Sequence, residues 1–214
     1  MQRSALIVFA ALLSLSSCAN PAANKPQAVT TEAAPVASPT VSISAATPAV
    51  SEKYLITPEN SKIQFVASKL TGSHDGSFQK FSGTINYTGQ VETSNVTINI
   101  EMASVTVDDP GLTKHLQTPD FFDVARYPQA VFTSTELKPA TTPGATHIVT
   151  GNLELHGVTK SITFPATITL TPEAISVDSS FSINRKDFNI NYAGAADNLI
   201  RDEVVLTLHV RAVK

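Results

Sequence analysis

The sequence predicts an all-β protein, a small eight-stranded antiparallel barrel with one short helical excursion. From residue 53 onward, apolar and polar residues alternate and Thr, Val and Ile are frequent; this period of two is typical of half-buried strands. Short turns such as Thr88-Gly89, His156-Gly157 and Thr171-Pro172 separate the runs, so successive strands should pair antiparallel. Closure into a barrel removes the exposed edges of such a sheet.

Eight runs carry the alternation, and one helix interrupts them. Between Pro110 and Pro128, Leu112, His115 and Leu116 have helical spacing, which predicts a short helix that ends before Pro119. The strands are expected around the following apolar series: Ile63-Phe65-Ala67, Phe81-Gly83-Ile85-Tyr87, Val96-Ile98-Ile100-Met102, Ala130-Phe132-Ser134, Val149-Gly151-Leu153-Leu155, Ile162-Phe164-Ala166-Ile168, Ile175-Val177-Phe181-Ile183 and Val204-Leu206-Leu208-Val210-Ala212.

Composition excludes several classes of function. The formal net charge is −3 and the pI is about 5.9, so no basic surface of the kind that binds nucleic acid is expected. The chain of 214 residues contains one cysteine, Cys18. A single cysteine excludes an internal disulfide framework and a cysteine-based structural zinc site.

Residues 1–18 have the features of a secretory signal peptide. Arg3 precedes the apolar run Ala5–Leu13, which is too short to span a bilayer, since a helix needs about 20 residues. Leu15-Ser16-Ser17-Cys18 resembles the bacterial lipobox, which implies lipidation of Cys18 and cleavage before it; an ordinary cleaved signal is the alternative. The residue after Cys18 is Ala19 rather than Asp, and the resemblance therefore implies the outer membrane, facing the periplasm.

Residues 19–52 are predicted to be a disordered tether. This segment is rich in Ala, Pro, Thr and Ser, with little charge and few aromatic residues. Such a composition buries too little apolar surface to offset the entropy of ordering the chain. The expected organisation is therefore a signal peptide over 1–18, a tether over 19–52 and a folded domain over 53–214.

Several stretches of the folded domain are more specific than a generic strand pattern. In their order and spacing they resemble the YceI-like family of bacterial envelope proteins over nearly all of residues 53–214. The stretches are Ser61–Lys69, Gly72–Phe78, Phe81–Gly83, His115–Asp123 (HLQTPDFFD), Tyr127-Pro128, Phe132–Ser134, Thr150–Lys160 (TGNLELHGVTK) and Ile183–Phe188.

The resemblance implies an extended lipocalin-like barrel with a long internal pore for polyisoprenoids, including isoprenoid quinones, and no established catalytic residue or cofactor. Two departures are visible. Asn189 stands where the family usually has Gly after the Asp-Phe pair, and Tyr192–Ile200 is a stretch of the variable kind that can reshape the mouth of the pore.

The alternation selects residues for the wall of such a pore. Small residues on the inward side, Ala67, Gly83, Gly151 and Ala166, favour a cavity over a fully packed interior. A register shift of one residue would turn the opposite set inward. The residues expected to line the ligand are Ile63, Phe65, Ile98, Ile100, Phe132, Leu153, Phe164, Phe181 and Leu206.

The polar residues favour structural roles over chemistry. His115 and Asp120 are expected to brace the helix and its loop, and no spacing typical of a metal site occurs, so no metal is expected. His74-Asp75-Gly76 is predicted to be a turn. Arg185 and Asp187 are predicted to share one face of a strand. They are expected to form ion pairs at the barrel rim, and contact with a ligand head group is the alternative; the partners considered are each other, Asp197, Arg201, Asp202 and Glu203.

Three functions remain open from the sequence. The favoured one is binding of an isoprenoid-type lipid for transport, storage or sequestration, without catalysis, in a protein attached to the membrane through Cys18. The others are an enzyme acting on such a lipid and a packed structural or stress-related envelope protein. Strand edges leave a homodimer possible, although no residue pattern indicates one.

Overall fold

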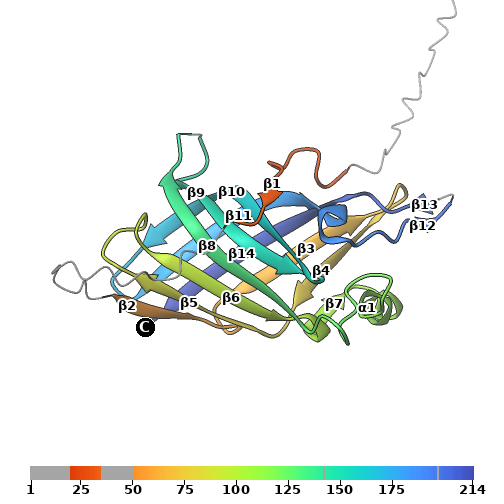
Figure 1. Ribbon diagram of the computed structural model, residues 1–214, viewed down its shortest axis with the longest axis horizontal. Helices are drawn as coiled ribbons and strands as arrows, with labels where there is room; N and C mark the ends of the chain where they lie inside the picture. Colours follow the sequence, from red (N-terminus) through yellow and green to blue (C-terminus); the bar gives the residue numbers. More distant parts are fainter. Residues whose placement is uncertain (1–19, 35–50, 142, 197) are drawn as a thin grey trace, which may run out of the picture.

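The computed structural model describes residues 20–34, 51–141, 143–196 and 198–214. They form an elongated antiparallel barrel that carries its one α-helix at one end (Figure 1). The predicted lipidation site Cys18, the signal peptide and residues 35–50 of the predicted tether lie outside the described residues. Among the residues described, no helix is long and apolar enough to cross a membrane.

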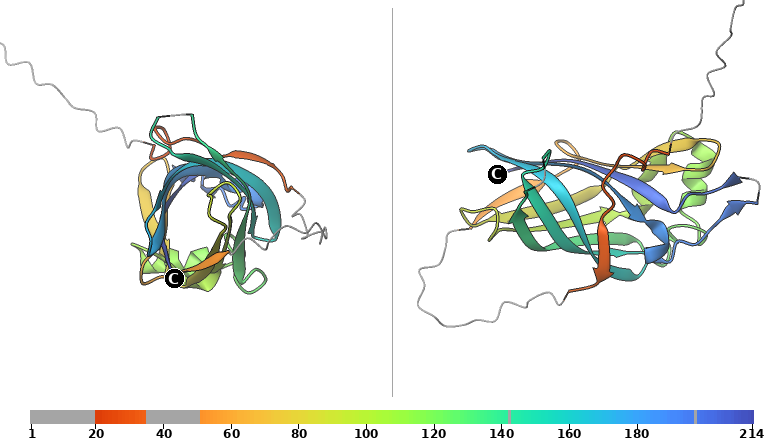
Figure 2. Two further views of the ribbon diagram at one scale, coloured as in Figure 1. Left: turned by 90° about the vertical axis from the view of Figure 1, so that its left-hand side faces the viewer. Right: turned by 90° about the horizontal axis from the view of Figure 1, so that it is seen from above.

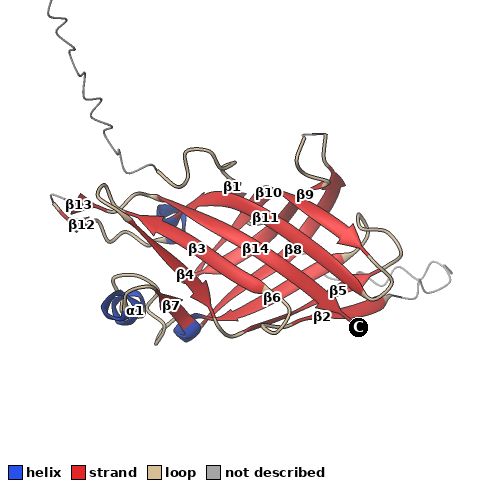
Figure 3. Ribbon diagram, turned by 180° about the vertical axis from the view of Figure 1, so that it is seen from behind, coloured by secondary structure: helices blue, strands red, loops and turns tan. Residues whose placement is uncertain are grey.

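The predicted eight-stranded barrel is confirmed. The strands that form its wall, which we call staves, follow the order β10-β9-β8-β6-β5-β2-β14-β11. β11 pairs with β10 and so closes the ring (Figures 2 and 3). The helices are α1 (Pro110–Leu116) and the 3₁₀ helices η1 (Met102–Ser104) and η2 (Arg185–Phe188). The strands are β1 (Val29–Glu32), β2 (Glu52–Ile56), β3 (Lys62–Ser68), β4 (Ser73–Phe78), β5 (Phe81–Tyr87), β6 (Asn95–Glu101), β7 (Val105–Val107), β8 (Gln129–Pro139), β9 (His147–Leu155), β10 (Val158–Leu170), β11 (Ala174–Asn184), β12 (Gly194–Ala195), β13 (Asn198–Leu199) and β14 (Glu203–Val213).

The first part of the barrel is built from interrupted strands. β2 and β3, β4 and β5, and β6 and β7 each follow one another after a short break, and η1 forms the last of these breaks. β2 pairs with β5, whereas β3 pairs with β4 and with Val205–His209 of β14. β3, β4 and β7 pair with one another or with β14, and they extend the wall toward the end that carries α1 (Figure 1).

The predicted turn at His74-Asp75-Gly76 is wrong. These residues lie in β4, where Asp75 pairs with Val66 and Gly76 pairs with Phe65. The chain reverses earlier, where the N–H of Lys69 donates to the carbonyl oxygen of Gly72 over 2.7 Å. Cross-strand pairing with β3 outweighs the local turn tendency of an Asp-Gly pair.

The short helix forms where the spacing predicts it. Asp109 is the N-cap, and its carboxylate accepts hydrogen bonds from the backbone N–H groups of Gly111 (2.6 Å) and Leu112 (3.0 Å). Pro110 occupies the first helical position, where its missing N–H costs nothing. These N–H bonds lower the pKa of the Asp109 carboxyl, and the buried Leu116 fixes the helix to the barrel.

The predicted disorder of residues 19–52 is wrong for residues 20–34. Val29–Glu32 form β1, which pairs antiparallel with Lys160–Thr163 of β10, and Ala28 is buried. The composition argument counted side-chain burial alone. Here the backbone N–H and C=O groups of the segment form hydrogen bonds with the barrel. The side chains of a Pro- and Ala-rich stretch give no sign of such bonds in the sequence.

Candidate functional site

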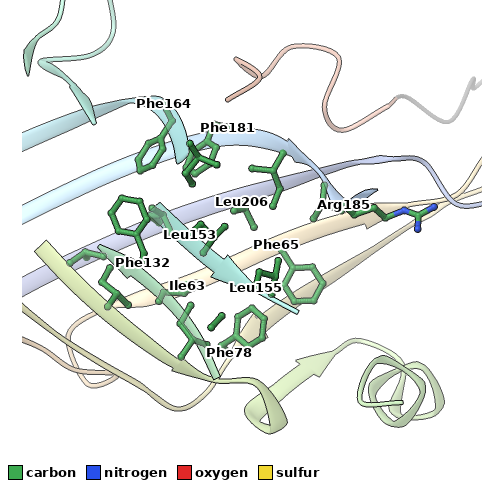
Figure 4. Close-up of a pocket in the computed structure, with 18 of the residues that line it drawn as sticks. Ile63, Phe65, Phe78, Phe132, Leu153, Leu155, Phe164, Phe181, Arg185 and Leu206 are labelled. Atoms are coloured by element: carbon green, nitrogen blue, oxygen red, sulfur yellow. The ribbon is translucent and has the colours of Figure 1, made fainter. Parts of the chain in front are cut away.

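An apolar cavity of about 200 Å³ lies inside the barrel (Figure 4). The described residues that line it are apolar except Arg185. An apolar cavity of about 150 Å³ stays dry and admits benzene. The enclosed space therefore suits a section of an apolar chain better than a polar ligand.

The nine residues predicted to line a ligand all lie on the wall of this cavity. They come from β3, β6, β8, β9, β10, β11 and β14, and the alternation of each strand turns them inward. The residues are Ile63, Phe65, Ile98, Ile100, Phe132, Leu153, Phe164, Phe181 and Leu206. That they contact a bound molecule remains a prediction.

The wall also contains residues that the strand pattern missed. They belong to α1, to the loop after it and to the segments flanking β12 and β13, where no period of two exists to reveal an inward side. The bulky Phe121-Phe122 pair was the one available signal. The missed residues of this group are Leu116, Phe121, Phe122, Ile190 and Ile200.

The small inward residues do not all create free space. A Cβ added to Gly151 would lie 2.4 Å from the ring of Phe132, and one added to Gly76 would lie 2.2 Å from the ring of Phe65. The rings thus occupy the volume above the two glycines. Of the four small residues predicted to leave room, only Ala67 lines the cavity; the space at Gly151 accommodates a neighbouring ring instead.

Aromatic rings form two groups along the wall. Phe164 stacks on Phe181 with ring centroids 4.1 Å apart and planes 9° apart, and Phe132 lies 5.9 Å from Phe164. Phe78 lies 5.7 Å from Phe65 and 6.0 Å from Phe122, nearer α1. Figure 4 shows the labelled rings around the cavity.

Arg185 lines one side of the cavity, but its guanidinium group is not directed into the cavity. Its guanidinium points away from the phenylalanines (Figure 4). It donates to the carbonyl oxygens of Ile190 (2.6 Å), Arg201 (3.1 Å) and Ile200 (3.4 Å), and to Asp202 (3.3 Å). Burial lowers the pKa of Arg185, and Asp202 opposes this. The side chain is 5% exposed, so the site is apolar even where it contains an arginine.

The predicted strand around Arg185 and Asp187 is wrong, although the expected ion pair with Asp202 is present. Residues 185–188 form η2, and Asn189 follows it in the left-handed conformation with φ of 59°. Glycine is the usual residue at such a helix end, and Asn is the common substitute. The turn places the aliphatic part of Arg185 on the wall and its head group in the loop.

The titratable residues His115 and Asp120 near α1 contact each other and have a structural role. His115 Nε2 lies 2.7 Å from Asp120 Oδ2, and the His115 ring packs edge-on against Phe121 and Tyr192. The contact fastens the end of α1 to its loop, as predicted. Within the described ranges, no three His, Cys, Asp or Glu side chains gather as a metal site would require.

Comparison with known sequences gives a consistent picture. The family model of the YceI-like domain matches residues 54–212. The UPF0312 protein of Pseudomonas putida strain W619 is 33% identical over 132 residues, which are 58% of this chain and 68% of that protein. The UPF0312 protein of Pseudomonas fluorescens is 31% identical over 138 residues, 61% of this chain and 71% of that protein.

Solved structures share the architecture. BcnA of Burkholderia cenocepacia superposes with a TM-score of 0.66 and 26% identity over 74% of this chain and 99% of that one. A polyisoprenoid-binding domain from Saccharophagus degradans, implicated in plant cell wall breakdown, gives 0.60 and 21% over 75% and 97%. The YceI protein of Campylobacter jejuni gives 0.57 and 25% over 65% and 84%.

Proposed function

This chain belongs to the YceI-like family, and from that premise we propose that it binds a long apolar lipid of the isoprenoid type, such as a polyisoprenoid or an isoprenoid quinone. The ligand would occupy the barrel cavity, and the protein would transport, store or sequester it at the bacterial envelope, held there by lipidated Cys18. Binding rather than catalysis is proposed. One solved structure of the same fold supports the ligand class, because it is a polyisoprenoid-binding domain.

The apolar wall is the observation that carries the proposal. Among the described residues of the wall, the one that is charged is Arg185, and it gives its donors to loop carbonyls and to Asp202. The described wall therefore offers a polar ligand no hydrogen-bond partner. An isoprenoid tail needs none. Burying one CH₂-sized group is worth about 0.8 kcal/mol, or roughly 4 kcal/mol for a five-carbon unit. A few units therefore exceed the cost of immobilising the ligand.

The test is to identify what the purified protein carries. Denaturing extraction followed by mass spectrometry should recover an isoprenoid-type lipid, and added long-chain quinone should bind with a stoichiometry near one. Phe164→Asp places a charge on the wall and should abolish recovery. Thr169→Asp, on an exposed position of the same strand, is the matched control and should bind like the parent.

Three results would contradict the proposal. Recovery of no lipid after expression in several conditions, together with no uptake of added quinone, would indicate a protein without this ligand. Equal binding by Phe164→Asp would place the lipid elsewhere. A released product that differs from the added lipid would indicate an enzyme.

A further inference from the structure

The barrel wall has a seam between β10 and β11. Their ladder joins Thr167–Leu170 to Ile175–Asp178, and it does not continue to Pro165, two residues before Thr167, which has no N–H to donate. There the Ser179 hydroxyl donates to the Pro165 carbonyl oxygen over 2.6 Å. Beyond this point the two strands take different partners: β11 continues along β14 as far as Asn184, while the outer edge of β10 meets another part of the chain.

That other part is the N-terminal segment 26–34, which enters the seam as an extra stave. Ser182 of β11 donates its N–H to the Pro26 carbonyl oxygen (2.9 Å) and accepts from the Ala28 N–H (2.8 Å). Val29–Glu32 then pair with β10. The segment therefore joins the two strands where they do not join each other, as the views from the side and from above show (Figures 1 and 2).

Two side chains of the barrel hold the far end of the segment through three polar contacts. The side-chain amide of Asn152 binds the backbone of Ala34 in both directions: Nδ2 donates to the carbonyl oxygen (2.7 Å) and Oδ1 accepts from the N–H (3.1 Å). Lys160 Nζ lies 2.6 Å from Glu32 Oε1. Asn152 is 7% exposed, so this β9 side chain is a largely buried amide whose two polar atoms both bind the backbone of the segment.

The cavity lies directly behind the segment. Ala28 packs in the same cluster as Phe164 of β10 and Phe181 of β11, and both phenylalanines line the cavity. Their stacked rings span the seam from the inside. Removing the segment would leave little more than this aromatic pair between the cavity and the outside.

The segment is weakly held compared with the other staves. Ala28, a small residue, is its only buried member from Pro26 to Glu32, and Val29 is 62% exposed. It is retained chiefly by backbone hydrogen bonds, each worth about 1 kcal/mol net, and such elements open locally before the fold does. By contrast, the other parts of the wall contribute large side chains such as Ile56, Ile85 and Phe121 to the buried core clusters.

We propose that the seam between β10 and β11 is a lateral portal through which the apolar lipid enters and leaves, and that residues 26–34 are the removable stave that closes it. This inference rests on the proposed lipid-binding function. Release of residues 26–34 would open the side of the barrel to a long apolar chain while the ladders of β10 with β9 and of β11 with β14 stay intact. Because the stave lies N-terminal to the domain, a pull on the N-terminus would act directly on the closure.

A reversible cross-link tests the portal. Val29 and Thr163 face each other across the β1–β10 ladder, at a separation that suits a disulfide. The chain carrying Cys18→Ser, Val29→Cys and Thr163→Cys is compared with one carrying Cys18→Ser, Thr169→Cys and Ser176→Cys, a pair within the ladder that already joins β10 to β11. The measurement is the transfer rate of fluorescently labelled geranylgeraniol from each protein to phosphatidylcholine vesicles.

Oxidation of the first pair should slow both loading and release about tenfold or more, and dithiothreitol should restore them; the control pair should leave both rates unchanged. Asn152→Ala, which frees Ala34 and changes no residue that lines the cavity, should speed release in the absence of any cross-link. Normal transfer by the oxidised first pair, or unaltered release from Asn152→Ala, would overturn the portal while binding stands. Absence of probe binding by the parent chain would instead remove the proposed function itself.

Discussion

The ring of Phe132 occupies the place of the side chain that Gly151 lacks. A Cβ at Gly151 would lie 2.4 Å from the ring and 2.6 Å from the carbonyl oxygen of Thr133. Because one of these neighbours is backbone, moving the ring would not relieve the contact. The glycine is therefore required by packing between β8 and β9, and it determines how far Phe132 projects into the cavity.

Gly151→Ala should destabilise the protein by about 1–3 kcal/mol, since an extra methyl group overpacks this part of the wall. Urea denaturation followed by circular dichroism measures the change. Gly72→Ala is the matched control, because a Cβ there meets nothing within 4 Å. Equal stability of the two variants would contradict the packing role of Gly151.

Arg185→Met should lower the free energy of unfolding by about 1–3 kcal/mol, because it leaves three loop carbonyls without their donor and Asp202 with Lys186 as its remaining partner. Lys186→Met is the control: Lys186 also contacts Asp202, at 2.9 Å, but is half exposed, and a surface pair contributes at most about 1 kcal/mol. Similar losses from both variants would refute a special role for Arg185.

The stability of the N-terminal end of α1 should decrease at acidic pH, because its cap is the Asp109 carboxylate. The N–H groups of Leu112 and Gly111 lower the pKa of Asp109 below its ordinary value of 3.8. A depressed carboxyl pKa stabilises the folded state above the unfolded-state pKa, and this stabilisation is lost as pH falls through the folded-state value. Amide exchange in α1 should therefore accelerate below about pH 3.8 in the parent, and less so in Asp109→Asn, which keeps a neutral cap. Identical acid profiles would argue against the effect.

Cys18→Ala should release the protein from the membrane fraction into the soluble fraction, because the thiol is the predicted site of lipidation. Cell fractionation with an antibody against the folded domain measures the distribution. Ser16→Ala keeps the small residue that the lipobox pattern requires, and this variant should stay with the membrane. Membrane retention of Cys18→Ala would support an ordinary cleaved signal with another mode of attachment.

The strands and the wall could be predicted because both follow from local alternation. Ile98 and Phe132 turn inward in successive staves for the same reason, and neither requires knowledge of a distant partner. The residues of the α1 end were missed because helix, loop and 3₁₀ segments have no shared period. The role of Arg185 was missed in part, since its carbonyl partners Ile190, Ile200 and Arg201 carry no side-chain signature.

The order of apolar and polar residues was sufficient to predict an eight-stranded barrel with an apolar inner face, because side-chain direction in a strand depends on near neighbours alone. It was not sufficient to predict that residues 26–34 cover the gap between β10 and β11. Val29 pairs with Thr163 through backbone groups, and the backbone of Ala34 meets the side-chain amide of Asn152, each across more than a hundred residues of chain. The backbone groups of the segment carry no signal in the sequence, because almost every residue type has them. Whether those groups bond to water or to the edge of β10 depends on where β10 and β11 diverge, and that divergence exists only once the barrel has formed.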